Sequence, residues 1–352
     1  MTSLGPIFAD DLARIKPGDR LRLTISAQTS DAAALAQAAL EARARGERVL
    51  VVCADPADVP RLAQEMPWFE PKLDVRPLPD WETLPYDVLS PQEELVSERL
   101  EALYRLTAPT GGADVLLTSA VTASQRLSPV SYIGANTFFF HQGEQISLTT
   151  LQKRLAAAGY ANVKQVLAAG EFAVRGSIVD VFPMGSERPF RLDFFDDEIE
   201  SIRWFDVDTQ RSMESAEEIR LLPGHEFPVD PEALLAFRQR WRREFAGDPK
   251  KSIVYCDIEK EILPPGIEYY LPLFFDETAA LTDYLPPNAR VFLLGDIEVA
   301  LQAFGRDMAS RYKVLAADPQ RPALAPERIW LKPEEFFKSL ANFAHFTVEK
   351  KE

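Results

Sequence analysis

The chain has 352 residues, the length of about two to three average domains. Hydrophobic residues make up 46% and charged residues 26% of it, which excludes a disordered or collagen-like chain. No apolar run reaches the roughly eighteen residues of a transmembrane helix, and the N-terminal segment carries acids where a signal peptide has an apolar block. We therefore expect no membrane contact and a cytoplasmic location.

The charge balance argues against a protein held to DNA by its whole surface. The chain has 39 basic and 54 acidic side chains, a net charge of −15. Non-specific nucleic-acid binding is disfavoured, although a local basic patch remains open. Cys53 and Cys256 lie far apart in apolar stretches, so we interpret them as reduced structural thiols rather than a disulfide.

The first third of the chain alternates short β-branched runs with longer helical periods. Residues 21–27 and 48–54 are predicted strands. Between them, Ser30 or Asp31 can cap a helix that ends near Gly46, where a left-handed cap belongs. This is one βαβ unit. Four further elements continue the pattern: a helix after Asp55-Pro56, a strand at 73–77, a helix at 92–106 and a strand at 114–119. The expected fold class here is α/β, with a parallel sheet covered by helices.

The pattern changes after about residue 135, where polar and apolar residues alternate as in an antiparallel α+β domain. The expected elements there are a strand and turn at 136–147, a helix at 148–160, a strand at 177–184, and a strand at 189–206 that doubles back at 196–198. Helical periods return after about residue 223, with a helix at 230–247, a strand at 289–295 and a helix after Asp296.

The simplest assembly is one α/β layer interrupted by a smaller inserted domain. The predicted boundaries are 1–130 for the first part of the layer, 131–222 for the insertion, 223–340 for the second part, and 341–352 for the start of a linker to further modules. The charged ending TVEKKE motivates that linker.

Nucleotide and metal chemistry find little support in the sequence. The turn at 27–31 lacks the glycines and the lysine of a phosphate loop, and Asp31 repels phosphate. The three histidines, His141, His225 and His345, are isolated and neither cysteine has a CxxC partner. We therefore expect no cofactor, no metal and no catalytic residue, with histidines that are exposed or structurally satisfied.

Two other groups of residues have a functional and a structural interpretation. An acidic group could hold a divalent cation or act as a catalytic pair, but a solvated turn beside an acidic strand face is favoured. It consists of Asp193, Asp196, Asp197, Glu198 and Glu200. The aromatic and proline-rich segment 80–91 could be a binding loop; the favoured interpretation is that Trp81 and Tyr86 pin a long connection to the core.

The segment 190–195 carries the strongest anomaly. A period of two places Phe190, Leu192 and Phe194 on one face and Arg191, Asp193 and Phe195 on the other. An exposed aromatic beside an arginine on a rigid strand is typical of interface hot spots. Arg175 can share that face unless Gly176 introduces a bulge, and a contact between Phe195 and the neighbouring layer is the alternative.

Four blocks of the sequence resemble one family. They are residues 80–106 (DWETLPYDVLSPQEELVSERLEALYRL), residues 170–212 (GEFAVRG through DVDTQRS), residues 221–228 (LLPGHEFP) and residues 263–275 (LPPGIEYYLPLFF). On these the chain resembles the N-terminal region of bacterial transcription-repair coupling factors, the part homologous to the excision-repair protein UvrB.

The resemblance implies a degenerate helicase-like domain, RecA-like and derived from a P-loop fold, interrupted by a UvrB-like domain. It also implies that a translocase motor, which contacts DNA, and an RNA polymerase-binding module lie beyond residue 352. In the longer family members a C-terminal domain is understood to mask the docking surface.

The same resemblance implies the partner and its contacts. The UvrB-like domain would dock UvrA, with the family's two arginines at Arg175 and Arg191 and its phenylalanine at Phe195. UvrB's phosphate loop and aromatic DNA-clamping hairpin are missing, since the segment 80–91 stands where that hairpin would begin. The expected function is a non-catalytic adaptor; a cryptic nuclease or ATPase and a weakly DNA-binding helicase-like module stay open.

Overall fold

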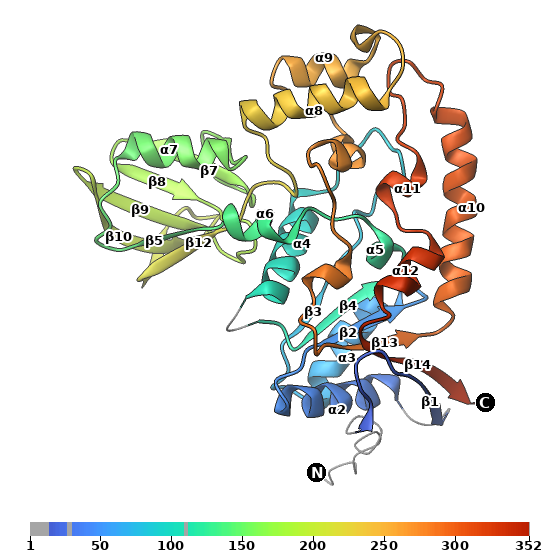
Figure 1. Cartoon of the computed structure of the whole chain (residues 1–352). Coiled ribbons are helices and arrows are strands. Elements are labelled where there is room, and N and C mark those ends of the chain that lie inside the picture. Colours follow the sequence, from blue (N-terminus) through green and yellow to red (C-terminus); the bar gives the residue numbers. More distant parts are fainter. Residues whose placement is uncertain (1–13, 27–29, 109–111, 352) are drawn as a thin grey trace.

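Two six-stranded sheets organise this mixed α/β chain (Figure 1). The structure is a computed structural model and describes residues 14–26, 30–108 and 112–351. The first sheet is parallel throughout. In spatial order its strands are β1 (Arg20–Ser26), β14 (Ala344–Lys351), β13 (Arg290–Leu294), β2 (Val49–Cys53), β4 (Val115–Ser119) and β3 (Val75–Pro77). Its strands therefore come from both ends of the chain.

Helices cover both faces of the first sheet, and every residue of its central strands β2, β4 and β13 is therefore buried. One face packs against α2 (Asp31–Ala44) and α3 (Asp58–Phe69). The other packs against α4 (Glu93–Thr107), α5 (Ala120–Ser124), α10 (Ile297–Leu315) and α12 (Pro333–Ser339). None of the helices that the structure describes combines the length and apolar character needed to cross a bilayer.

The predicted strand–helix–strand order and the helix caps are confirmed, although β14 and β13 lie between β1 and β2 in the sheet. The Ser30 hydroxyl caps α2 by accepting a hydrogen bond from the Ala33 amide. Gly46 follows the helix with a φ of +70°, the left-handed conformation that glycine adopts without strain. Cys53 is buried in β2 and, like Cys256, is a free thiol.

The second sheet comes from the middle of the chain. Its strands in spatial order are β11 (Ser212–Ala216), β10 (Glu198–Phe205), β9 (Phe190–Phe195), β8 (Ile178–Val181), β7 (Glu171–Arg175) and β6 (Ala161–Asn162). α7 (Leu148–Ala157) packs Leu151 and Leu155 into the same core as Leu192 and Phe194. Beside this sheet, α6 (Val130–Ala135) leads into a separate antiparallel pair of β5 (Phe138–His141) and β12 (Glu218–Leu221).

A third core cluster, rich in aromatic side chains, holds together α8 (Pro231–Glu244), α9 (Ile253–Glu259), α11 (Pro326–Ile329) and the 3₁₀ helix η2 (Ile267–Leu273). Two further 3₁₀ helices are η1 (Pro249–Lys251), which buries none of its residues, and η3 (Leu281–Tyr284), which packs into the same core as Leu192. The segment 80–91 joins the third cluster: Trp81 is 3% exposed, and the Tyr86 hydroxyl donates to the Leu324 carbonyl at 2.9 Å. The prediction that both rings pin a long connection to the core is confirmed.

The prediction that residues 341–352 begin a linker is wrong for the part that the structure describes. Residues 344–351 form β14, which lies between β1 and β13. Phe346 and Val348 are buried in this strand, and the Phe346 ring stacks on Phe292 with centroids 4.7 Å apart. Burial of these apolar side chains outweighs the polar residues that alternate with them.

A buried carboxyl group beside the segment 80–91 leads to a pH-dependent stability prediction. Burial raises the pKa of Glu268 from 4.5 to about 7, although the Ser90 hydroxyl donates to its carboxylate at 2.8 Å. The folded chain therefore holds this proton more tightly than the unfolded chain. It follows that this group's contribution to the free energy of unfolding is lost as pH rises from about 4.5 through about 7.

We expect Glu268→Gln to raise the free energy of unfolding by about 2 kcal/mol at pH 8 and to change it little at pH 4. Urea titrations at the two pH values measure the difference. Glu277→Gln, at an exposed loop position, is the matched control. An equal effect of Glu268→Gln at both pH values contradicts the assignment.

Candidate partner-binding face

Side chains of β9 alternate between the core and the open face of the second sheet. Leu192 and Phe194 are buried, Arg191 and Asp193 are partly exposed, and Phe195 is 69% exposed. The predicted alternation is confirmed. The alternative, in which Phe195 is covered by the neighbouring layer, does not hold.

Arg175 lies on the same face as Phe195. A two-residue turn with Gly176 at a φ of +62° joins β7 to β8 and leaves the pairing in register. Arg175 is opposite Ile178, which is in turn opposite Asp193. Directly opposed residues of antiparallel strands point to one face. The bulge considered from the sequence is therefore absent from this described hairpin.

A buried carboxylate, Asp180 on β8, joins the two arginines. Arg191 donates to it through Nε at 2.7 Å and Nη2 at 2.9 Å, and Arg175 donates through Nη2. Asp180 is fully buried, whereas the Arg175 side chain is 50% and the Arg191 side chain 14% exposed. The sequence analysis missed Asp180. The available signal was a lone charge between Val179 and Val181 in an apolar strand.

The Arg191 guanidinium is bound mainly to other residues of this domain and is little exposed to a partner. Its Nη1 also donates to the Gln210 carbonyl at 3.2 Å and the Ser212 hydroxyl at 3.1 Å, and its guanidinium lies 4.9 Å from the Phe205 ring centroid. The hydrogen bond to Asp180 raises the pKa of Arg191. Charge reversal at Arg191 thus disturbs a buried ion pair and tests folding as well as binding.

The acidic group beside this face forms a turn, as the favoured interpretation predicted. Asp196 adopts a φ of +53° between β9 and β10, and Phe195 is paired with Glu198 across the hairpin. Within the described ranges, no group of three or more His, Cys, Asp or Glu side chains could hold a metal ion.

His345 and His141 have the environments that the sequence predicted, whereas the His225 ring stacks on Phe227 with centroids 5.5 Å apart and is not hydrogen-bonded to any residue that the structure describes. Burial lowers the pKa of His225 to about 4, so its ring is neutral at pH 7. His345 Nδ1 lies 3.2 Å from the Phe343 carbonyl oxygen, and the exposed His141 lies 3.4 Å from a carboxylate oxygen of Glu218.

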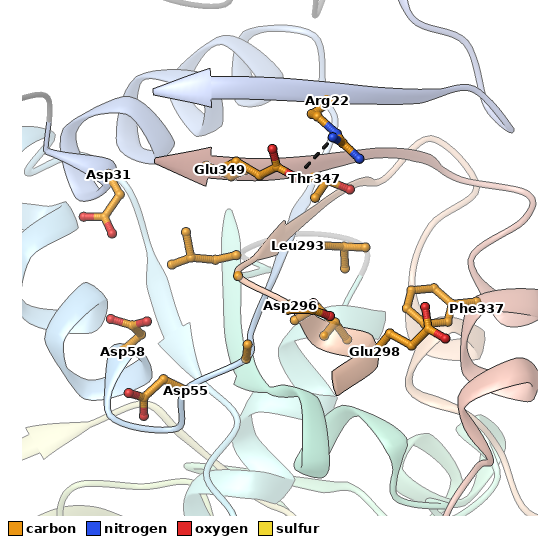
Figure 2. Close-up of a pocket in the computed structure, with 15 residues that line it drawn as sticks. Arg22, Asp31, Asp55, Asp58, Leu293, Asp296, Glu298, Phe337, Thr347 and Glu349 are labelled. Atoms are coloured by element: carbon orange, nitrogen blue, oxygen red, sulfur yellow. Dashed lines mark ion pairs between the residues drawn. The ribbon is translucent and has the colours of Figure 1, made fainter. Parts of the chain in front are cut away.

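A cavity of about 730 Å³ opens at the carboxyl ends of β2, β13 and β14 (Figure 2). Ligands of open parallel sheets usually bind at such an edge. Figure 2 shows carboxylates around this cavity, with one cation, Arg22, among the described charged residues that line it. The carboxylates are those of Asp31, Asp55, Asp58, Asp296, Glu298 and Glu349. Their charge is unfavourable for nucleotide phosphates.

The N-terminus of α2 is already occupied by one of these carboxylates. Asp31 Oδ1 accepts a hydrogen bond from the Ala32 amide at 2.9 Å, and Arg61 donates to both Asp31 oxygens at 3.0 and 2.9 Å. In a phosphate loop this helix end would hold an anionic ligand. Residues 27–29 of the predicted turn lie outside the described residues. The described helix start therefore fits an internal ion pair rather than a phosphate.

Comparisons with known proteins agree with the resemblance read from the sequence. Residues 138–227 match the UvrB interaction domain family. The transcription-repair-coupling factor of Escherichia coli K12 is 42% identical over 296 residues, covering 84% of this chain and 26% of the relative. That of Haemophilus influenzae is 44% identical over 279 residues, covering 78% and 24%. The homologous factor of Bacillus subtilis is 32% identical over 216 residues, covering 57% and 18%.

The chain thus spans about a quarter of the length of the first two of these curated relatives. The interval that matches the UvrB interaction domain contains Arg175, Arg191 and Phe195. The predicted residues therefore all lie within the matched domain.

Proposed function

We propose that this chain, which carries a UvrB interaction domain and resembles part of the transcription-repair-coupling factors, is a non-catalytic adaptor of transcription-coupled nucleotide excision repair. Its task would be to recruit UvrA. The observation that carries the proposal is the exposed ring of Phe195, held on a strand of the matched domain and on the same face of the sheet as Arg175.

The contact we propose combines burial of an aromatic ring with a charge pair. Phe195 would enter an apolar pocket on UvrA, and Arg175, which is half exposed, would meet an acidic group there. Asp180 would hold Arg175 and Arg191 in place, so that little side-chain entropy remains to be lost on binding. Arg191 would act chiefly through this support.

We further propose that the parallel sheet belongs to a degenerate helicase-like domain formed by residues 1–130 and 223–340, with β14 added to it. The UvrB-like domain, residues 131–222, would interrupt it. Support comes from the chain order, because the strands of the first sheet flank those of the second. The acidic cavity and the ion pair at the start of α2 favour an absence of ATP turnover.

In longer relatives, RNA polymerase and DNA would be bound by other regions, and a C-terminal domain would mask this face until docking is required. The chain itself would act in the cytoplasm, where free thiols such as those of Cys53 and Cys256 persist.

The decisive experiment measures association of the chain with its cognate UvrA. We expect saturable binding, no ATP hydrolysis above background by the chain alone, and no affinity for a DNA duplex that falls with salt in the way phosphate contacts do. Failure to associate with folded UvrA contradicts the proposal. ATP turnover by the purified chain contradicts its non-catalytic part.

A further inference from the structure

β10 places a second arginine directly beside Arg191. Arg203 is paired with Arg191 on β9 and with Ser215 on β11. Because directly opposed residues of antiparallel strands point to one face, Arg203 lies on the face that carries Arg175 and Phe195. The face therefore holds three arginines: Arg175 on β7, Arg191 on β9 and Arg203 on β10.

Pairing irregularities flank Arg203 in β10. The register against β9 shifts between Ile199 and Ser201, and the register against β11 shifts between Arg203 and Phe205. Ile202 and Phe205 are buried, whereas Arg203 is exposed. Bulges of this kind redirect side chains and are enriched beside functional sites. Ile202 thus packs into the main core and Phe205 into a small separate cluster with Val166 and Ala173, while Arg203 is presented to solvent.

The charges of this face are unequally compensated. Like charges directly opposed across two strands are destabilising. Asp180 balances Arg191 and also binds Arg175, but the Arg203 side chain makes no ion pair or hydrogen bond with any residue that the structure describes. An arginine that costs folding stability and lacks an internal partner is suited to a carboxylate on another molecule.

We propose that Arg203 is a further UvrA-contacting residue and carries the exposed cationic role that the sequence analysis gave to Arg191. This inference rests on the proposed function. The partner surface would present a carboxylate near the pocket that receives Phe195. Arg203 would meet it at the rim of the contact, where charge governs association rate and salt dependence more than packing does.

The experiment measures the Kd of the full chain for UvrA at low and high salt. We expect Arg203→Ala to weaken binding about five-fold and Arg203→Glu more than about ten-fold at low salt, with both differences shrinking at high salt. Arg311→Glu is the matched control: Arg311 is exposed on α10, on the opposite side of the molecule from the second sheet (Figure 1), and its reversal should leave Kd unchanged.

A parallel measurement with Phe195→Ala separates this inference from the proposed function. If Phe195→Ala binds as tightly as the wild type, the proposed docking face is wrong. If Phe195→Ala loses affinity while Arg203→Glu retains it, only the role of Arg203 is wrong. If circular dichroism shows that Arg203→Glu is unfolded, Arg203→Gln removes the charge with less perturbation, and unchanged binding by that variant overturns the inference.

Discussion

Replacing Phe195 with alanine is expected to weaken association with UvrA by about thirty-fold or more without loss of folding stability. The ring is 69% exposed, so its removal leaves no cavity in the core. Aromatic anchors at the centre of an interface typically cost more than about 2 kcal/mol when truncated, which corresponds to that factor in Kd. Titration calorimetry gives the affinity, and a thermal melt followed by circular dichroism gives the stability.

The matched control for this substitution is Phe139→Ala. Phe139 lies on β5 and is 45% exposed, but it belongs to the separate β5–β12 pair rather than to the second sheet. Its removal tests whether any exposed ring of this domain matters. Equal losses for Phe139→Ala and Phe195→Ala would show a non-specific surface effect, and no loss for either would remove Phe195 from the interface.

The position of Phe195 could be predicted because it follows from a local period. Alternation along 190–195 depends on strand geometry alone, and the apolar residues at 192 and 194 fix which face turns inward. The burial of the Arg191 side chain, which is 14% exposed, could not be predicted in this way. It depends on Asp180 in the neighbouring strand and on Gln210 and Ser212, which fold over the guanidinium from the other side of β10. Sequence spacing carries no information on such contacts.

The C-terminal strand β14 could not be predicted from the sequence for the same reason. Apolar Phe346 and Val348 alternate with polar residues, a pattern short enough to occur in a charged tail. Its partners in the sheet are β1 and β13, and β1 begins more than three hundred residues earlier, at Arg20. Only the assembled sheet distinguishes a strand from a linker here, because the stabilising contacts are all long-range.

A buried ion pair also joins residues that lie far apart in the sequence, Arg99 and Glu226. Arg99 on α4 is fully buried and donates through Nε to Glu226 at 2.8 Å and through Nη1 to the Pro79 carbonyl at 2.7 Å. The Trp81 indole donates to the other Glu226 oxygen at 3.0 Å. One carboxylate thus links α4, the segment 80–91 and the stretch that follows β12.

We expect Arg99→Met to lower the free energy of unfolding by about 3 to 5 kcal/mol, since it leaves the Glu226 carboxylate buried and uncompensated. Adding Glu226→Leu should restore part of that loss, because the double variant buries no unpaired charge; a double-mutant cycle in urea gives the coupling. Arg126→Met, at the partly exposed pair with Glu335, should cost less than about 1 kcal/mol. A double variant as unstable as the sum of the two single ones contradicts the charge argument. Binding of UvrA by the folded fraction should stay unchanged, since Phe195 lies outside this network.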